Sequence, residues 1–232
     1  AADLGLNVAM IERHRTLGGV CLNVGCIPSK ALLHVAGKIL MADEPAHGVQ
    51  FAKPTINLEA IRHHRQSTVD TLTSNLALMA KGRKVTVFYG EGKFDSTNSI
   101  TVSKDGSEEK VAFKNAIIAV GSRAIKLPFV PYDDPRILDS TSALQLERIP
   151  EHLLILGGGI IGLEMATVYQ SLGAKITVAE LGEQVMTGAD NDLVKVFEQV
   201  NKDRMSFLTK TQVTNIEATP EALNVTLKDK DG

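Results

Sequence analysis

The sequence predicts an α/β chain built from two Rossmann-like units in series. The order strand–helix–strand occurs twice, and a glycine-rich loop joins strand to helix in the second unit. In both units an acidic residue also ends a strand. The 232 residues, 44% of them hydrophobic, provide enough apolar material for one large α/β domain or two smaller ones.

Composition argues against some classes of partner. The formal net charge is −2, so no global positive field attracts nucleic acid or anionic lipid. No stretch approaches the roughly 20 consecutive apolar residues that a membrane-spanning helix needs. We therefore expect no nucleic-acid partner and no membrane span. His63 and His64 have no third ligand at a suitable spacing, so no metal site is predicted.

The first unit opens with the end of a helix at residues 1–4, which Gly5 stops, and a strand at residues 7–11. A natural domain seldom begins inside a helix without its first strand. We therefore expect the chain to be a fragment of a longer protein. Residues 228–232 are expected to form the turn of an unfinished hairpin.

Two helices and several short strands follow. Apolar residues at helical spacing predict one helix from near Pro28 to Leu40, and a second that Asn57 caps and Gly82 ends. The proline-rich stretch 128–150 is expected to cross between domains. Strands separated by polar turns are predicted at residues 85–89, 100–102, 111–113 and 116–120.

The second unit comprises a strand at 153–156, a helix at 161–172 stopped by Gly173, and a strand at 175–179. Its loop, Gly157-Gly158-Gly159-Ile160-Ile161-Gly162, follows the strand and opens the helix, the context that a dinucleotide fingerprint requires. The first glycine of the fingerprint, Gly157, permits the tight turn. The second, Gly159, lets the backbone approach a pyrophosphate, and Gly162 lets the helix pack against the strand.

Glu180 ends the strand that follows this helix. Its carboxylate can accept hydrogen bonds from both ribose hydroxyls of NAD and repels a 2′-phosphate. The next residues, Leu181, Gly182 and Glu183, bring no arginine or lysine to pair with such a phosphate. NAD is therefore favoured over NADP.

Glu12 repeats this pattern at the end of the first strand. It should bind the ribose of another adenine dinucleotide, whose glycine loop would lie before Ala1. An ordinary glutamate at a strand end is the alternative.

Cys21 and Cys26 are the only two cysteines. Residues five apart on a regular helix lie about 140° apart around the axis, too far for the Cα separation of about 4.4–6.8 Å in a disulfide. The first turn must therefore be distorted, and Gly25 can provide the backbone freedom. Cys26 then lies at a helix N-terminus, where N–H groups and the helix dipole favour the thiolate. Redox chemistry explains the pair better than a structural cross-link worth only about 2 kcal/mol, or a metal site lacking two ligands.

The stretch GGVCLNVGCIPSK resembles the active-site signature of the flavin-dependent pyridine nucleotide–disulfide oxidoreductases. The similarity to the dihydrolipoamide dehydrogenases of Gram-negative bacteria runs nearly end to end, through SKALLHVA, LALMAKGRKV, NAIIAVGSR, DPRILDST and LILGGGIIGLEMATVY.

The resemblance implies roles for matching residues. Cys21 would be the thiol that exchanges with dihydrolipoyl sulfur, and Cys26 the thiolate against the flavin. Lys30 would lie near the reactive edge of the flavin, and Glu164 would pair with it. Further residues would line FAD, namely Glu12, Gly18, Gly19, Val20, Cys21, Lys30, Gly92 and Gly121. A third set would line NAD, namely Gly157, Gly158, Gly159, Ile160, Ile161, Gly162, Glu180 and Val213.

The resemblance also implies an FAD-binding domain at 1–149, lacking its first strand and glycine loop, and the N-terminal part of an NAD-binding domain at 150–232. The intact enzyme would be a cytoplasmic homodimer. It would reoxidise the dihydrolipoyl domain of 2-oxo acid dehydrogenase complexes, using a Cys21–Cys26 disulfide and FAD to reduce NAD+. None of the six histidines occupies the motif of the catalytic base. That motif and the dimerisation domain are expected outside this chain, so the chain alone should show little activity.

Other functions remain open at this point. Glu180 disfavours an NADP-linked glutathione reductase. A mercuric reductase or another disulfide reductase of the same family is harder to separate, because its additional cysteines would lie beyond this chain. A non-enzymatic FAD-binding module is an alternative of another class, against which the cysteine pair argues.

Overall fold

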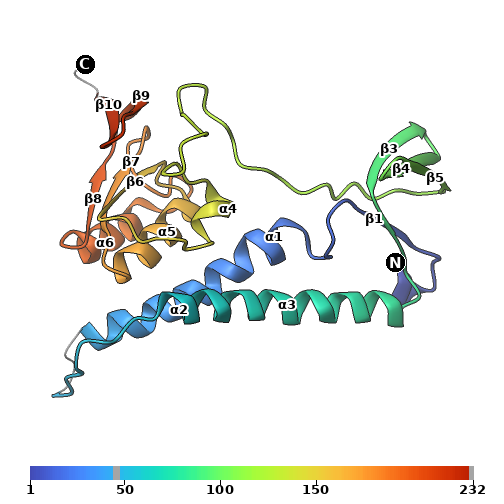
Figure 1. Cartoon of the computed structure of the whole chain (residues 1–232), viewed down its shortest axis with the longest axis horizontal. Helices are drawn as coiled ribbons and strands as arrows, with labels where there is room; N and C mark the ends of the chain where they lie inside the picture. The colour runs from blue at the N-terminus through green and yellow to red at the C-terminus, as the bar shows by residue number, and fades with distance from the viewer. Residues whose placement is uncertain (44–47, 230–232) are drawn as a thin grey trace. The chain divides into compact units, whose positions relative to one another are not determined.

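The computed structural model describes residues 1–43 and 48–229 (Figure 1). The chain divides into two compact units. Unit 1 comprises residues 1–27 and 66–123, and unit 2 comprises residues 28–65 and 124–232. The predicted boundary between residues 149 and 150 stays a prediction.

Unit 1 contains a short parallel pair of strands and a three-stranded antiparallel sheet. The turn η1 (Ala2–Leu4) ends at Gly5, whose φ of 78° suits glycine. Strand β1 (Ala9–Glu12) then pairs in parallel with β2 (Thr86–Tyr89). The second sheet has the order β3-β4-β5, with bounds Glu91–Ser96, Ser99–Lys104 and Ser107–Ala112. The predicted strands at 85–89, 100–102 and 111–113 are confirmed within a few residues.

Two expectations for unit 1 were wrong. Strand β3 was missed because its sequence EGKFDS lacks an apolar alternation, and all six residues are exposed. The strand predicted at 116–120 does not form, and Ile117 and Val120 are 88% and 83% exposed. An extended segment needs a neighbouring strand for its N–H and C=O groups. Within the described residues, no strand pairs with this segment.

The cysteines lie on two consecutive helices. Helix α1 (Gly19–Val24) ends at Gly25, and α2 (Cys26–Asp43) begins immediately afterwards, two residues before the predicted start at Pro28. Asn57 caps the long helix α3 (Leu58–Gly82) as predicted, since its Oδ1 accepts a hydrogen bond from the amide of Ala60 at 3.0 Å.

One stretch is a correction to the membrane expectation. Among the described residues, Gly19–Asp43 is long and apolar enough, by length and composition alone, to cross a membrane. Its mean hydropathy over a window is high although Lys30 and Lys38 interrupt it, so the sequence contains no unbroken apolar run there. The structure breaks the stretch at Gly25 and buries Leu32 and Ala36, which are 1% and 2% exposed. Over the most apolar window, 33% is buried, and Leu32 and Ala36 belong to the packed face of α2.

Unit 2 contains the predicted strand–helix–strand unit. Strand β6 (His152–Leu156), helix α5 (Ile160–Ser171) and strand β7 (Lys175–Ala179) follow one another, and the parallel sheet has the order β6-β7-β8. The remaining elements are α4 (Ser140–Ala143), α6 (Asn191–Asn201), β8 (Met205–Leu208) and the antiparallel hairpin of β9 (Gln212–Ala218) and β10 (Leu223–Lys228). The turn expected at 228–232 falls mostly outside the described residues.

The core of unit 2 joins α2 to the sheet. Leu32 of α2 packs in one buried cluster with Leu163 and Tyr169 of α5 and Ile176 of β7. Burial of such side chains contributes about 1.5–3 kcal/mol each. This packing fixes α2 against α5, and these two helices carry Lys30 and Glu164.

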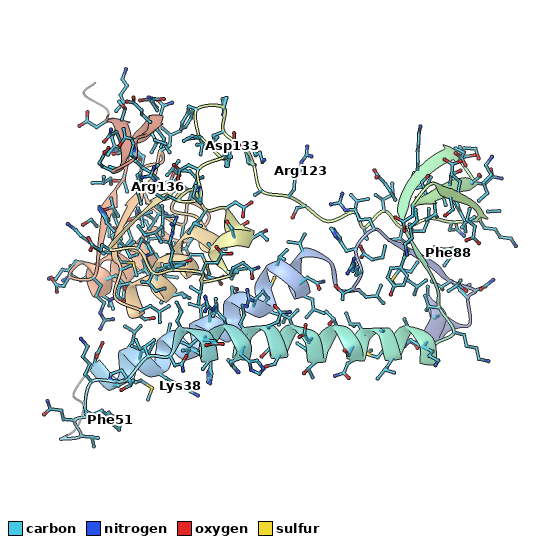
Figure 2. All side chains as sticks on the ribbon, viewed as in Figure 1. Lys38, Phe51, Phe88, Arg123, Asp133 and Arg136 are labelled. Atoms are coloured by element: carbon cyan, nitrogen blue, oxygen red, sulfur yellow. The ribbon has the colours of Figure 1, made fainter. Side chains whose placement is uncertain are left out.

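Side chains hold the predicted crossover at 128–150 in place. The Arg136 guanidinium, labelled in Figure 2, donates to both carboxylate oxygens of Asp134 at 2.9 and 2.7 Å and to the carbonyl of Thr219 at 2.6 Å. Hydrogen bonds from Arg136 lower the pKa of Asp134 to about 2. Arg65 donates to the carbonyl of Leu144 at 2.8 Å, which ties the crossover to α3.

Candidate functional site

The cysteine segment is shaped by glycines and by one asparagine. Gly18 and Gly19 have φ values of 113° and 60°, which suit glycine. A Cβ at Gly25 would lie 3.0 Å from the carbonyl oxygen of Val20 and 3.2 Å from the Cα of Cys21. A side chain at residue 25 would therefore require the backbone of α1 to shift by a few tenths of an ångström. Asn23 steadies the segment by donating to the carbonyl of Gly19 at 2.9 Å.

Both thiols lie at accessible positions. Cys21 is the third residue of α1, Cys26 is the first residue of α2, and both are exposed. The placement of Cys26 at a helix N-terminus is confirmed. Their redox roles stay predictions.

Lys30 and Glu164 form an ion pair. The Nζ of Lys30 on α2 donates to Oε1 of Glu164 on α5, a pairing that the family resemblance implied. The two side chains differ in burial, because Lys30 is 60% exposed and Glu164 only 18%. The more buried carboxylate thus holds a cation one turn along the helix from Cys26. Their action on a flavin stays a prediction.

The glycine loop between β6 and α5 has the form that a dinucleotide site requires. Gly157 has a φ of 94°, which provides the tight turn. A Cβ at Gly162 would lie 2.5 Å from the carbonyl oxygen of Gly157, so α5 packs directly on the loop. At Gly159 a Cβ would meet no atom within 4 Å, which leaves the backbone open to a ligand. Ile160 and Ile161 open the helix and are exposed.

Glu180 is held against this loop by two short hydrogen bonds. Its Oε2 accepts from the amide of Gly158 and its Oε1 from the amide of Gly182, both at 2.6 Å. A carboxylate has about four acceptor sites, so two remain for other donors. Val213, also predicted to line NAD, is 8% exposed and packs with Ala179 in a second apolar cluster.

The residues predicted around the first dinucleotide lie in unit 1, except Lys30, which lies in unit 2. Glu12 ends β1, and its Oε1 accepts from the amide of His14 at 2.8 Å. Gly92 lies in β3, where a Cβ would meet Ile100 at 3.1 Å and Ile11 at 3.2 Å. A Cβ at Gly121 would lie 3.6 Å from Cγ2 of Val20. The structure thus brings Gly121 and Val20 together, while their contact with FAD stays a prediction.

Sequence reasoning missed a pocket at the end of β1. It is lined by residues that follow Glu12, by the end of β2 and by β4, namely Arg13, His14, Arg15, Tyr89, Gly90 and Lys104. The crevice beyond the carboxyl end of a strand is the usual ligand position in such sheets. The sequence pointed only to Glu12 at this strand end. Arg13, His14 and Arg15 come together with Lys104 in the folded structure, and no local sequence pattern links them.

Lys210 was missed for the same reason. It lies beyond β8, and its Nζ forms an ion pair with Glu183 at 3.0 Å, directly after the Glu180 loop. No local sequence signal links residues 183 and 210.

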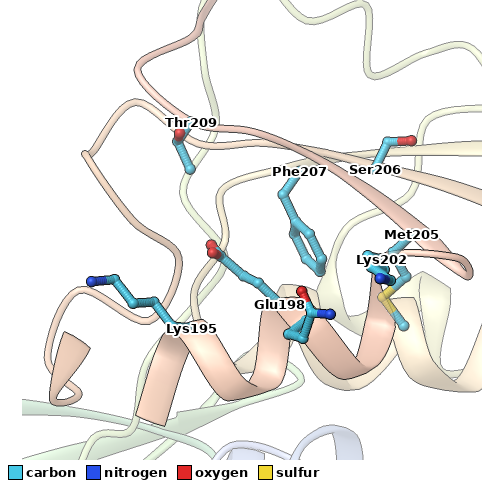
Figure 3. A pocket seen from close by; sticks show the side chains of 8 residues that line it. Lys195, Glu198, Lys202, Met205, Ser206, Phe207 and Thr209 are labelled. Carbon is cyan, nitrogen blue, oxygen red and sulfur yellow. The ribbon is translucent and has the colours of Figure 1, made fainter. Parts of the chain in front are cut away.

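A further pocket lies between α6 and β8 (Figure 3). None of the residues that line it belongs to the predicted sites. They are Lys195, Glu198, Gln199, Lys202, Met205, Ser206, Phe207 and Thr209. Within residues 1–43 and 48–229, no group of three or more His, Cys, Asp or Glu side chains is arranged to hold a metal ion.

Comparison with known proteins gives consistent matches. The family model for pyridine nucleotide-disulphide oxidoreductases matches residues 1–232. The dihydrolipoyl dehydrogenase of Vibrio parahaemolyticus is 53% identical over 230 residues, which are 99% of this chain and 48% of that protein. The dihydrolipoyl dehydrogenase of Haemophilus influenzae is 48% identical over 231 residues, 99% of this chain and 48% of that protein. The chain therefore spans about half the length of the curated relatives that it matches.

Solved structures agree. The Cu(II) complex of the HOCl-induced flavoprotein disulfide reductase RclA from Escherichia coli has a TM-score of 0.82 at 26% identity, over 97% of this chain and 48% of that chain. LpdA from Mycobacterium tuberculosis has a TM-score of 0.86 at 23% identity, over 97% of this chain and 50% of that chain, which shows the shared fold. With the cysteine helices and the glycine loop in place, these matches establish that the chain belongs to the pyridine nucleotide–disulfide oxidoreductase family.

Proposed function

We propose that this chain is part of a dihydrolipoyl dehydrogenase, which oxidises dihydrolipoyl groups and reduces NAD+. The observation that carries the proposal is the 53% identity over 99% of the chain to a protein of that name. The two thiols on consecutive helices and the Lys30–Glu164 pair supply the residues that this chemistry needs.

The residues of unit 2 fit NAD. The open backbone at Gly159 and the N-terminus of α5, which has no side-chain cap, offer N–H groups to a pyrophosphate. The carboxylate of Glu180 keeps two acceptor sites beyond those taken by Gly158 and Gly182, enough for two ribose hydroxyls. We therefore assign NAD to this loop.

The residues of unit 1 fit the adenosine part of FAD less completely. Glu12 lies at the carboxyl end of β1, beside the pocket that Tyr89 and Lys104 help to line. Gly18 and Gly19 leave the backbone before the cysteine helix without side chains. Bound FAD would supply two-electron transfer between the cysteine pair and NAD.

The cysteines perform thiol–disulfide exchange. A dihydrolipoyl thiolate attacks the Cys21 sulfur of the Cys21–Cys26 disulfide, and the sulfur of Cys26 leaves as a thiolate. The second dihydrolipoyl sulfur then displaces Cys21, which forms the lipoyl disulfide and leaves both cysteines reduced. The leaving sulfur, that of Cys26, belongs to the first residue of α2.

Further proposals concern the domains, the oligomeric state and the partner of the whole protein. We propose an FAD-binding domain at 1–149 and the beginning of an NAD-binding domain at 150–232. The intact enzyme would work as a cytoplasmic homodimer that serves the dihydrolipoyl domain of a 2-oxo acid dehydrogenase complex. The catalytic base is assigned to no histidine of this chain.

A substrate comparison tests the activity. The full-length protein should reduce NAD+ with dihydrolipoamide, and should show much lower rates with NADP+, oxidised glutathione or mercuric ion. Activity confined to NADP-linked glutathione reduction would contradict the proposal. The Cys26→Ser variant should lose the long-wavelength absorption of a thiolate against the flavin on partial reduction, whereas survival of that band would contradict the role of Cys26.

A further inference from the structure

The turn after β8 is joined to the loop that carries Glu180. The amide of Glu180 donates to the carbonyl of Leu208 at 2.8 Å, and the amide of Thr211 donates to the carbonyl of Glu180 at 2.9 Å. Between them, the amide of Lys210 donates to the carbonyl of Gly182 at 2.9 Å. Three backbone hydrogen bonds thus place Lys210 beside the acidic loop, although it is 30 residues from Glu180 in the sequence.

Lys210 holds this position in a backbone conformation that few lysines adopt. Its φ is 53°, in the left-handed region that disfavours residues with a Cβ. Non-glycine residues in that region are often found at functional sites. The side chain of Lys210 reaches the loop, where its Nζ pairs with Oε1 of Glu183 at 3.0 Å.

We propose that Lys210 and Glu183 are specificity-determining residues of the dinucleotide site, in addition to Glu180. Glu183 neutralises Lys210, so this edge carries two carboxylates and one ammonium group, and a 2′-phosphate meets a net negative charge. When both carboxylates are removed, the ammonium group of Lys210 becomes available to bind a 2′-phosphate. This inference rests on the proposed NAD site between Gly157 and Glu180.

Exposure and hydrogen bonding both allow Lys210 to change partner. The Lys210 side chain is 48% exposed and that of Glu183 is 86% exposed, so their ion pair is screened by water and easily exchanged. A phosphate offers more acceptors and more charge than one carboxylate. The amides of Gly158 and Gly182 donate hydrogen bonds to the Glu180 carboxylate. Removal of Glu180 leaves both amides free to donate to a phosphate.

The test uses binding, because binding does not depend on a working flavin. ADP-ribose and 2′-phospho-ADP-ribose are titrated by calorimetry into the full-length wild-type protein, the single variant Glu180→Ala, and three combined variants. The first is Glu180→Ala with Glu183→Gln. The second adds Lys210→Met, and the third instead adds Lys175→Met as a matched control. Lys175 is an exposed lysine at the opposite end of β7 from Glu180.

The first variant should bind 2′-phospho-ADP-ribose about 10-fold more tightly than the second, the change expected for one charged hydrogen bond. The control variant should match the first. Raising the salt concentration should reduce the difference, because the contact is exposed. The kcat/KM ratio for NADP+ over NAD+ should follow the same order.

Equal 2′-phospho-ADP-ribose affinity in the first and second variants would overturn the inference for Lys210. Glu180→Ala alone binding as tightly as the first variant would overturn the inference for Glu183. Failure of the wild-type protein to bind ADP-ribose would contradict the proposed NAD site itself, so the two failures are distinguishable.

Discussion

The glycine loop of unit 2 contains two glycines with separable tasks, and alanine substitutions should separate them. At Gly162 a Cβ would lie 2.5 Å from the carbonyl oxygen of Gly157 and 3.0 Å from Cγ2 of Ile155. At Gly159 it would meet no atom within 4 Å, and the φ of −74° suits any residue. Gly162→Ala should therefore lower the stability of the fold, whereas Gly159→Ala should weaken only the binding of the ligand.

The size of each effect follows from these contacts. Overpacking costs about 1–3 kcal/mol, and the clash at Gly162 is with backbone, which cannot rotate away. Because backbone is involved, we take the upper part of that cost, about 2–3 kcal/mol. Alanine recovers up to about 1 kcal/mol of helix propensity over glycine, so Gly162→Ala should destabilise by about 1–2 kcal/mol. Gly159→Ala should be close to neutral, because the entropy gain of up to about 1 kcal/mol is offset by the poorer fit of alanine at the N-cap of α5. The loss of one charged hydrogen bond to a phosphate costs about 1.5–3 kcal/mol, which weakens binding roughly 10- to 100-fold.

Two assays on the full-length protein separate the effects. Chemical unfolding followed by circular dichroism gives the free energy of unfolding, and calorimetric titration with ADP-ribose gives the dissociation constant. Gly188→Ala is a control for glycine replacement, because a Cβ there also meets no atom within 4 Å. The reasoning is refuted if Gly159→Ala binds ADP-ribose as tightly as the wild type, or if Gly162→Ala unfolds at the wild-type midpoint.

Three further predictions concern stability. Burial raises the pKa of Tyr169 to about 12, so the folded state retains the phenol proton and stability should fall as pH rises from about 10 to 12. Tyr169→Phe should remove this dependence and cost about 1–3 kcal/mol at neutral pH, because the carbonyl of Ala143 loses its donor at 2.8 Å. The pKa of Asp134 is about 2 beside Arg136, so its contribution should be present above about pH 4 and lost toward pH 2. Acid titration of Asp134→Asn, followed by circular dichroism, should lack that loss. Leu32→Ala should destabilise by about 2–5 kcal/mol in denaturant titrations, since Leu32 is 1% exposed; a change below about 1 kcal/mol would contradict its place in the core.

Local signals in the sequence predicted most elements. The bounds of β7 at Lys175–Ala179 agree with the predicted strand, and Asn57 caps α3, because alternation and capping act over a few residues. Residues 116–120 show where this approach fails. Their apolar composition suits a strand, but a strand also needs a partner, and pairing is a property of the fold.

The candidate site divides in the same way. The cysteines and the glycine loop lie in continuous motifs, so their spacing alone indicated their chemistry. Lys210 has no such motif, and only the fold carries it to Glu183. The three residues after Glu180 include no lysine. The end of the neighbouring strand β8, however, also lies beside that loop and brings Lys210 to it.

The position of Glu180 connects the fold of the second unit to its selectivity. Its carboxylate is already fixed by the amides of Gly158 and Gly182, and the Gly158 carbonyl accepts from the amide of Met186 at 2.8 Å. Hydrogen bonds within the protein thus join the glycine loop to the loop after β7. Ordering a loop on binding would consume part of the binding free energy. Because internal hydrogen bonds hold these loops, we expect this cost to be small in the proposed NAD site. The charges at the strand end would then act directly on the choice between a ribose hydroxyl and a 2′-phosphate.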